Sequence, residues 1–200
     1  FESANGTDVT VGLADGAVWE SAASVSEKGV TFLPNIPTEE VFTAPHKDKV
    51  NGVAYGTKPY IHGGQTIRGF HVTFRDGKIV EYGAEENEAL LGEVLDTDEG
   101  ARHIGEVALV PASSPINRSG VIFYNTLFDE NASCHIAFGA SYPGTTRGGN
   151  ALSEEELLAR GMNQSLIHED VMIGAADTRI TGRTRSGQDV ALFENGEWVL

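Results

Sequence analysis

Two alternating arms around a turn dipeptide are the sequence feature that most constrains the fold. Gly69–Glu81 reads G-F-H-V-T-F-R-D-G-K-I-V-E, and apolar and polar residues alternate on both sides of Asp76-Gly77. A period of two places successive side chains on opposite faces of a strand, and Asp-Gly favours the type I′ turn of a tight hairpin. The sequence therefore predicts an antiparallel hairpin over this segment.

Similar patterns predict that most of the chain consists of strands separated by turns. The other predicted strands are Thr7–Leu13, Ile104–Val110, Val121–Tyr124, and the arms Val190–Phe193 and Trp198–Leu200 of a second hairpin around Asn195-Gly196. The predicted helical segments are Glu85–Leu95, a short turn from Asp96-Thr97 through Arg102, a turn within Leu127–Ala137, and Glu154–Arg160, which follows a capping box at Ser153 and ends at Gly161. The expected fold class is α+β, rich in antiparallel strand with a few short helices. No linker-like stretch divides residues 1–200, so we expect a single domain.

The charge balance argues against two classes of partner. The formal net charge is −15 at pH 7, whereas a nucleic-acid-binding protein needs a surplus of Lys and Arg to neutralise phosphates. The same acidic excess repels anionic lipid surfaces, and no apolar run approaches the roughly 20 residues that span a bilayer. We therefore expect neither a nucleic-acid nor a membrane partner.

The single cysteine, Cys134, predicts the compartment rather than the chemistry. One cysteine cannot form an internal disulfide, which fits a reducing compartment such as the cytoplasm. Its neighbour His135 suggests a nucleophile with a base, but adjacent residues on a strand face opposite ways. A buried structural thiol is the favoured interpretation.

A histidine and an aspartate two residues apart form the most informative candidate site. In an extended segment His168 and Asp170 point to the same face, and Glu169 points to the opposite one, which makes Glu169 the carboxylate least suited to the same ligand. An imidazole beside a carboxylate suits a divalent metal or a hydrolytic site. Such a pair taken alone more often caps a surface strand.

Further candidates lie elsewhere in the chain, and each has a structural alternative. Glu106 interrupts the apolar run Ile104–Val110, where a buried carboxylate would need a partner or a metal, although an exposed edge strand would also accommodate it. Glu39 and Glu40 follow Pro37 and are typical of solvated carboxylates at a helix start. His135 stands between a polar and an apolar segment, as core or capping histidines often do. Together these imidazoles and carboxylates suit a two-metal hydrolytic site, but their spacing matches no short metal motif.

Four runs resemble the aminopeptidase T / aminopeptidase S family of bacterial metallo-aminopeptidases. They are Asn35–His46 (N-I-P-T-E-E-V-F-T-A-P-H), Gly100–Val110 (G-A-R-H-I-G-E-V-A-L-V), Phe123–His135 (F-Y-N-T-L-F-D-E-N-A-S-C-H) and His168–Gly174 (H-E-D-V-M-I-G). The resemblance extends from end to end of the chain. Because family members carry an additional N-terminal α/β domain, the resemblance implies that residues 1–200 are the C-terminal, metal-binding portion of a longer protein. The first residue, Phe1 rather than Met, agrees with this expectation.

The resemblance also implies a function and a site. It implies a metal-dependent aminopeptidase that removes N-terminal residues from peptides, works as a homodimer around an enclosed cavity, and uses two divalent ions, with Zn, Co, Mn and Mg as the metals to consider. The metal ligands that it implies are Glu40, Glu106, His135, His168 and Asp170, with Tyr142 beside the metals.

Roles within this site follow from general chemistry. Asp170 is a bridging candidate because a carboxylate has two oxygens, and Tyr142 could ligate weakly or donate to the developing oxyanion. The free amino group of the substrate would bind one metal. A general base is also required, and the candidates are Glu39 or a ligand carboxylate such as Glu40 or Glu106. The alternatives are a non-catalytic β-rich dimerisation or binding fragment, and a truncated enzyme that binds metal but turns over poorly.

Overall fold

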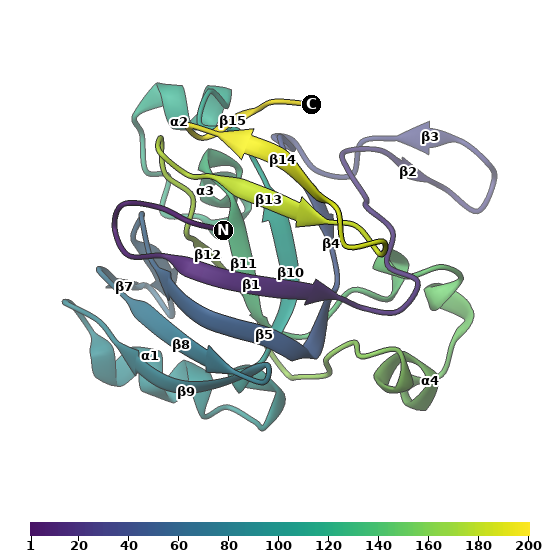
Figure 1. The fold of residues 1–200 in the computed structure, drawn as a ribbon, viewed down its shortest axis with the longest axis horizontal. Coiled ribbons are helices and arrows are strands. Elements are labelled where there is room, and N and C mark those ends of the chain that lie inside the picture. Colours follow the sequence, from purple (N-terminus) through teal and green to yellow (C-terminus); the bar gives the residue numbers. More distant parts are fainter.

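Two antiparallel sheets form the body of the molecule, which we describe from a computed structural model of residues 1–200 (Figure 1). The first sheet has the order β1-β5-β8-β9. Its strands are β1 (Asp8–Leu13), β5 (Pro45–Tyr55), β8 (His71–Arg75) and β9 (Lys78–Gly83). The second sheet has the order β12-β11-β10-β4. Its strands are β4 (Val41–Thr43), β10 (Ile104–Leu109), β11 (His135–Gly139) and β12 (His168–Met172).

One hydrophobic core joins these two sheets. The first sheet contributes apolar side chains such as Val50 and Val72, and the second contributes Val107, Ile136 and Phe138, all of which are almost fully buried. The alternation of strand side chains explains why Ile136 and Phe138 share this face while their neighbours face away from it. The second sheet is thus covered on its core face by the first sheet.

Smaller elements surround this body. The remaining strands are the pairs β2 (Ser24–Val25) with β3 (Thr31–Phe32) and β6 (Tyr60–His62) with β7 (Gln65–Ile67), and the sheet of β13 (Ile180–Arg183), β14 (Asp189–Glu194) and β15 (Glu197–Trp198). The helices are α1 (Glu88–Leu95), α2 (Pro115–Ser119), α3 (Thr126–Asp129), α4 (Glu154–Ala159) and the short 3₁₀ turns η1 (Gly100–Arg102), η2 (Glu130–Ala132), η3 (Pro143–Thr145) and η4 (Gly149–Ala151). The β2–β3 pair projects from the body as an arm (Figure 1).

The expected fold class is confirmed, and so are its main local features. The predicted hairpins correspond to β8–β9 and β14–β15, and the capping box at Ser153 opens α4 with both of its hydrogen bonds to Glu156. Helix α1 begins at Glu88 rather than at Glu85, because the backbone of Glu85 and Glu86 is hydrogen-bonded to Arg68 instead.

One predicted strand is wrong. Val121–Tyr124 is irregular, and Tyr124 adopts a left-handed backbone conformation with φ of 55°. The carboxylate of Asp129 accepts hydrogen bonds from the backbone N–H groups of Phe123 and Asn125. These donors are therefore used within a local loop rather than in a strand ladder.

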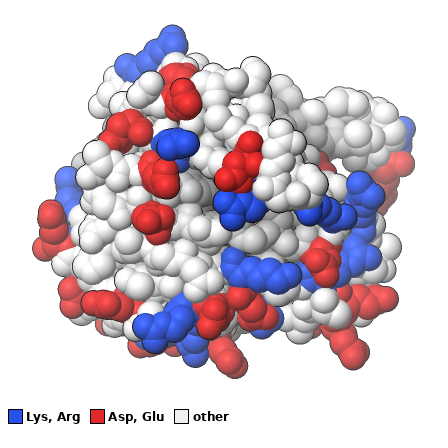
Figure 2. Space-filling view, in the orientation of Figure 1, with Lys and Arg blue, Asp and Glu red and all other residues white.

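The helices are short. None of them has the length and hydropathy that crossing a bilayer would require. Charged side chains of both signs are spread over the face shown in Figure 2, with acidic ones in excess over the chain as a whole.

Candidate metal centre

Strand register gathers the candidate residues on one face of the second sheet. Ala137 in β11 is paired with Asp170 on one side and Glu106 on the other, and Gly139 is paired with His168. His135 lies two residues before Ala137 and therefore shares its face. This cavity face is opposite to the core face that carries Ile136 and Phe138.

A bulge in β10 directs Glu106 to the cavity. The pairing with β11 shifts between Ile104 and Glu106, so that Ile104 lies in the core although it is two residues from Glu106. Gly105 makes this possible, since a Cβ at that position would collide with the carbonyl oxygen of Ala140. The carboxylate of Glu106 is consequently held among the other candidates, with only 5 % of the residue exposed.

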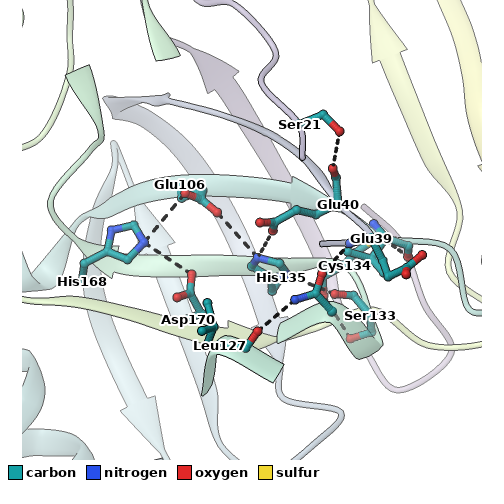
Figure 3. A network of polar contacts seen from close by, with 12 residues as sticks. Ser21, Glu39, Glu40, Glu106, Leu127, Ser133, Cys134, His135, His168 and Asp170 are labelled. Carbon is teal, nitrogen blue, oxygen red and sulfur yellow. Dashed lines mark hydrogen bonds and ion pairs between the residues drawn. The ribbon is translucent and has the colours of Figure 1, made fainter. Parts of the chain in front are cut away.

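Five side chains converge in two groups that share Glu106 (Figure 3). In the first group, His135 Nε2 lies 3.0 Å from Glu40 Oε2 and 3.6 Å from Glu106 Oε1. In the second, His168 Nε2 lies 3.8 Å from Glu106 Oε2 and 3.5 Å from Asp170 Oδ1. Within each group the potential ligand atoms lie within 4.8 Å of one another. Glu106 is the one residue that belongs to both groups.

Both imidazoles are oriented by their second nitrogen. His135 Nδ1 lies 3.1 Å from the carbonyl oxygen of Ser133, and His168 Nδ1 lies 2.7 Å from that of Ala140. A carbonyl can only accept, so Nδ1 carries the proton in each ring. Nε2 of each ring is then directed at the space between the carboxylates, where its lone pair would bind a metal once the second proton is lost, as in metal-binding histidines.

Several buried atoms of the cluster lack hydrogen-bond partners. They are Glu40 Oε2, His135 Nε2 and Asp170 Oδ1. His135 Nε2 and Glu40 Oε2 are only 3.0 Å apart, but the angles between them do not allow a hydrogen bond, so both atoms remain without one. Two ligands about 2.1 Å from a tetrahedral metal lie about 3.4 Å apart, close to most of the separations observed here. The residues present therefore fit a divalent cation.

The electrostatics of the cluster depend on burial and on close opposite charges. Burial raises the pKa of Glu106. Burial alone would lower the pKa of His168, but Asp170 and Glu106 raise it to about 9. The pKa of His135 is likewise raised well above its usual value, against burial, by Glu106 and Glu40. Burial opposes ionisation of Asp170, yet the two histidines hold its pKa below the ordinary value.

Tyr142 lies at the edge of the same cluster. Its ring centroid is 4.5 Å from that of His168, and about half of the residue is exposed. Burial and the charge of Asp170 raise the pKa of Tyr142 to about 12, so the phenol is protonated at neutral pH. Its hydroxyl is therefore a hydrogen-bond donor in the cavity.

Glu39 is placed differently from its neighbour Glu40. Glu40 lines the cavity, whereas Glu39 is exposed and does not line it. The backbone N–H of Glu39 donates to the side chain of Asn131 at 2.6 Å, and its carboxylate lies apart from the cluster (Figure 3). The structure thus does not bring Glu39 to the position of a base.

Four members of the cluster, Glu40, Glu106, His168 and Asp170, line the floor of an open cavity of about 1020 Å³, and His135 is buried beneath it. The arm, β6, α3 and the η3–η4 segment contribute to its walls. Its carboxylate-bearing residues are Glu20, Glu40, Glu106, Glu130, Glu169 and Asp170. No Lys or Arg lines it. The cavity therefore favours cations.

Two cavity residues were not predicted as site residues from the sequence. Glu130 in η2 lines the cavity next to Asp170, and His62 in β6 pairs with Glu169 at 3.0 Å. Glu169 belongs to neither ligand group, as strand alternation predicts. The only sequence signal for Glu130 was its place within the run Phe123–His135.

Cys134 is buried, and it exchanges hydrogen bonds with the backbone of Val110 through its sulfur. Burial raises the pKa of this thiol to about 11. A thiol with so high a pKa is a poor nucleophile at neutral pH, so a structural role fits it better.

Comparisons with known proteins identify aminopeptidases as similar proteins. The chain is 54 % identical over 197 residues to Aminopeptidase 2 from Geobacillus stearothermophilus and 50 % identical over 197 residues to Aminopeptidase AmpS from Bacillus subtilis (strain 168), covering 98 % of this chain and 48 % of each relative. It superposes on wild-type AmpT from Thermus thermophilus with a TM-score of 0.91 and 46 % identity, again over 98 % of this chain and 48 % of the other. The chain thus spans about half the length of the relatives it matches.

The model of the thermophilic metalloprotease (M29) family matches residues 1–198. The resemblance found in the sequence is therefore confirmed. This chain belongs to the thermophilic metalloprotease (M29) family.

Proposed function

We propose that this chain carries the catalytic centre of a metal-dependent aminopeptidase with a co-catalytic pair of divalent metals. The single observation that carries the proposal is the pair of overlapping ligand groups, which are buried, contain unpartnered polar atoms and share Glu106. The aminopeptidase relatives and the metalloprotease family support the reaction class.

The ligand groups suggest how the metals would be held. Glu40, Glu106 and His135 would hold one ion, and Glu106, His168 and Asp170 the other. Divalent Zn, Co, Mn or Mg bound there would polarise the scissile carbonyl and lower the pKa of a bound water towards neutrality.

Tyr142 and the cavity wall supply the remaining functions. The protonated hydroxyl of Tyr142 can donate to the oxygen of the scissile carbonyl as negative charge develops on it. The acidic lining, with no Lys or Arg, attracts the ammonium group of a peptide with a free N-terminus. Because Glu39 does not line the cavity, we assign the proton-accepting role to a carboxylate inside it.

Hydrolysis of aminoacyl-p-nitroanilides tests this proposal. The chain should be loaded with zinc or cobalt and compared with a longer version that has the length of the relatives. We expect the longer version to release p-nitroaniline. The His168→Ala variant of the longer version should not release it, because this change removes a metal ligand and leaves the other ligands, Asp170 and Glu106, in place. Full activity of His168→Ala would exclude His168 as an essential ligand.

The same assay separates the alternatives. A truncated enzyme would bind metal and hydrolyse slowly as the 200-residue chain but rapidly as the longer version. A non-catalytic dimerisation or binding fragment would bind no metal, and neither length would hydrolyse the substrate.

We also propose that the protein forms a homodimer through the arm. An isolated two-stranded hairpin is marginally stable. This one and the segment directly after it expose five large apolar side chains: Val25, Val30, Phe32, Leu33 and Ile36. Most of the arm's surface in Figure 2 is uncharged. Light scattering coupled to gel filtration should report a dimer, and replacing Phe32 and Leu33 by Ser should shift it to a monomer.

A further inference from the structure

Glu130 is a carboxylate of the inner cavity that belongs to neither ligand group. It lies next to Asp170, half-buried, and it lines the cavity together with four of the five clustered side chains, all except His135. Its carboxyl group interacts electrostatically with Asp170, His135 and Glu40. Glu130 therefore lies close enough to the metal centre to contact a molecule bound there.

The backbone that carries Glu130 is held by hydrogen bonds on both sides. On one side, the carboxylate of Asp129 accepts from the N–H groups of Phe123 and Asn125 at 2.8 and 3.1 Å. On the other side lies the side-chain amide of Asn131, a residue that is only 1 % exposed. Its oxygen accepts a hydrogen bond from the backbone N–H of Glu39, and its nitrogen donates one to the backbone carbonyl of Leu127. These contacts fix the turn without using the side chain of Glu130.

No lysine or arginine of the protein pairs with this carboxyl group. Glu130 forms no ion pair, and no Lys or Arg lines the cavity. Glu169 on the cavity wall differs, since it is paired with His62 at 3.0 Å. Ionising a half-buried carboxyl group that has no counter-ion is costly, and a cationic ligand beside it would favour the ionised form and offset that cost.

The neighbouring Asp170 shows that polar groups of the protein at this place also lack partners. Its Oδ1 is buried and has no hydrogen-bond partner, and His135 Nε2 in the same cluster is fully buried and also unpartnered. The candidate metal centre and the carboxyl group of Glu130 thus lie side by side in one cavity.

We propose that Glu130 binds the α-ammonium group of the substrate's N-terminal residue, as a specificity-determining residue. This inference rests on the proposed function, because it requires the end of a peptide to lie at the metal centre. The α-ammonium would donate to Glu130 while the scissile carbonyl lies over the ligand groups. Peptides with a blocked N-terminus lack this contact, which would explain selection for free N-termini.

A pair of matched ligands tests the role of Glu130 by calorimetric titration of the zinc-loaded chain. The pair is leucine hydroxamate and 4-methylpentanohydroxamate, which has the same side chain and metal-binding group but no amino group. The wild-type chain should prefer the amino ligand. In Glu130→Gln this preference should fall by roughly 10- to 100-fold, as expected for one hydrogen bond between charged groups, while the affinity for the des-amino ligand stays the same.

Two controls accompany the titration. Glu169→Gln removes a carboxylate from the same cavity wall and should keep the wild-type preference, because Glu169 is paired with His62. Zinc content and thermal unfolding should be measured for each variant. If Glu130→Gln does not fold, Glu130→Ala provides the same test, since it also removes the charge.

The outcomes distinguish this inference from the proposed function. An unchanged preference in Glu130→Gln would overturn it, as would loss of bound zinc from that variant, which would make Glu130 a metal ligand. Equal binding of the two ligands to the wild-type chain would overturn it and leave the metal centre intact. Failure of both ligands to bind the wild-type chain would instead contradict the proposed function.

Discussion

The two faces of the second sheet are both buried, but their side chains have opposite consequences. On the core face, Val107, Ile136 and Phe138 are surrounded by apolar side chains of the first sheet. On the cavity face, Glu106 and His135 are as deeply buried, yet polar atoms there have no hydrogen-bond partner in the protein. Burial by itself therefore does not separate a structural residue from a functional one.

The difference lies in whether the buried atoms have partners within the chain. Each large apolar side chain on the core face stabilises the fold by about 1.5–3 kcal/mol. The cavity face instead holds polar groups whose desolvation is offset only when a ligand binds. Changes on the core face should thus lower stability, and changes on the cavity face should remove metal binding.

The largest effect on stability is expected from Phe138→Ala. Phe138 is fully buried and packs against Phe70, with 6.3 Å between ring centroids. Its truncation should lower the free energy of unfolding by about 3–5 kcal/mol, measured by urea denaturation. The folded fraction should still bind metal, because no ligand is changed. A loss of metal binding without loss of stability would contradict the separation of the two faces.

The next largest effect is expected from Glu106→Gln on metal affinity. Removing a residue that only hydrogen-bonds to a metal ligand lowers metal affinity by roughly 10- to 100-fold. Loss of Glu106, a ligand shared by both groups, should therefore lower it by more than roughly 100-fold. Competition with a fluorescent zinc chelator measures this affinity. The matched control is Asp189→Asn, which changes an exposed carboxylate paired with Arg183 and should leave zinc affinity unchanged.

These comparisons also show what could be read from the sequence. The hairpins, the capping box and the shared orientation of His168 and Asp170 follow from patterns within a few residues, and the structure has them. The irregular Val121–Tyr124 segment could not be foreseen, because side-chain hydrogen bonds of Asp129 override its apolar pattern.

The assembled cluster also lay beyond the pattern of the residues alone. Glu40, Glu106 and Asp170 are far apart in the sequence, and only strand register and the bulge at Gly105 bring them together. Family resemblance supplied the members of this set. Neither source identified Glu130, whose position depends on the tertiary placement of η2.

A smaller effect, of predictable sign, is expected from pH on the metal-free chain. Asp170 and Glu106 raise the pKa of His168 from 6.5 to about 9, overcoming burial, and burial with Asp170 raises the pKa of Glu130 from 4.5 to about 9. Both groups hold their protons more tightly in the folded state. Their contribution to stability is therefore fully present below the unfolded-state pKa values and is lost as the pH rises towards 9.

Urea denaturation in the presence of EDTA would measure this dependence. The free energy of unfolding should fall from about pH 4.5 through Glu130, and more steeply between about pH 6.5 and 9, where His168 also contributes. The zinc-loaded chain should show the opposite trend up to neutral pH, because metal binding requires deprotonated ligands. Equal pH dependence with and without zinc would place the titrating groups outside the metal centre.

Metal stoichiometry tests the central proposal most directly. The purified chain should be loaded with zinc, dialysed against metal-free buffer and analysed by inductively coupled plasma mass spectrometry, alongside Glu106→Gln. We predict two ions per wild-type chain and a marked loss in the variant. A wild-type chain that retains no divalent ion after loading would contradict the assignment of the buried cluster as a metal centre.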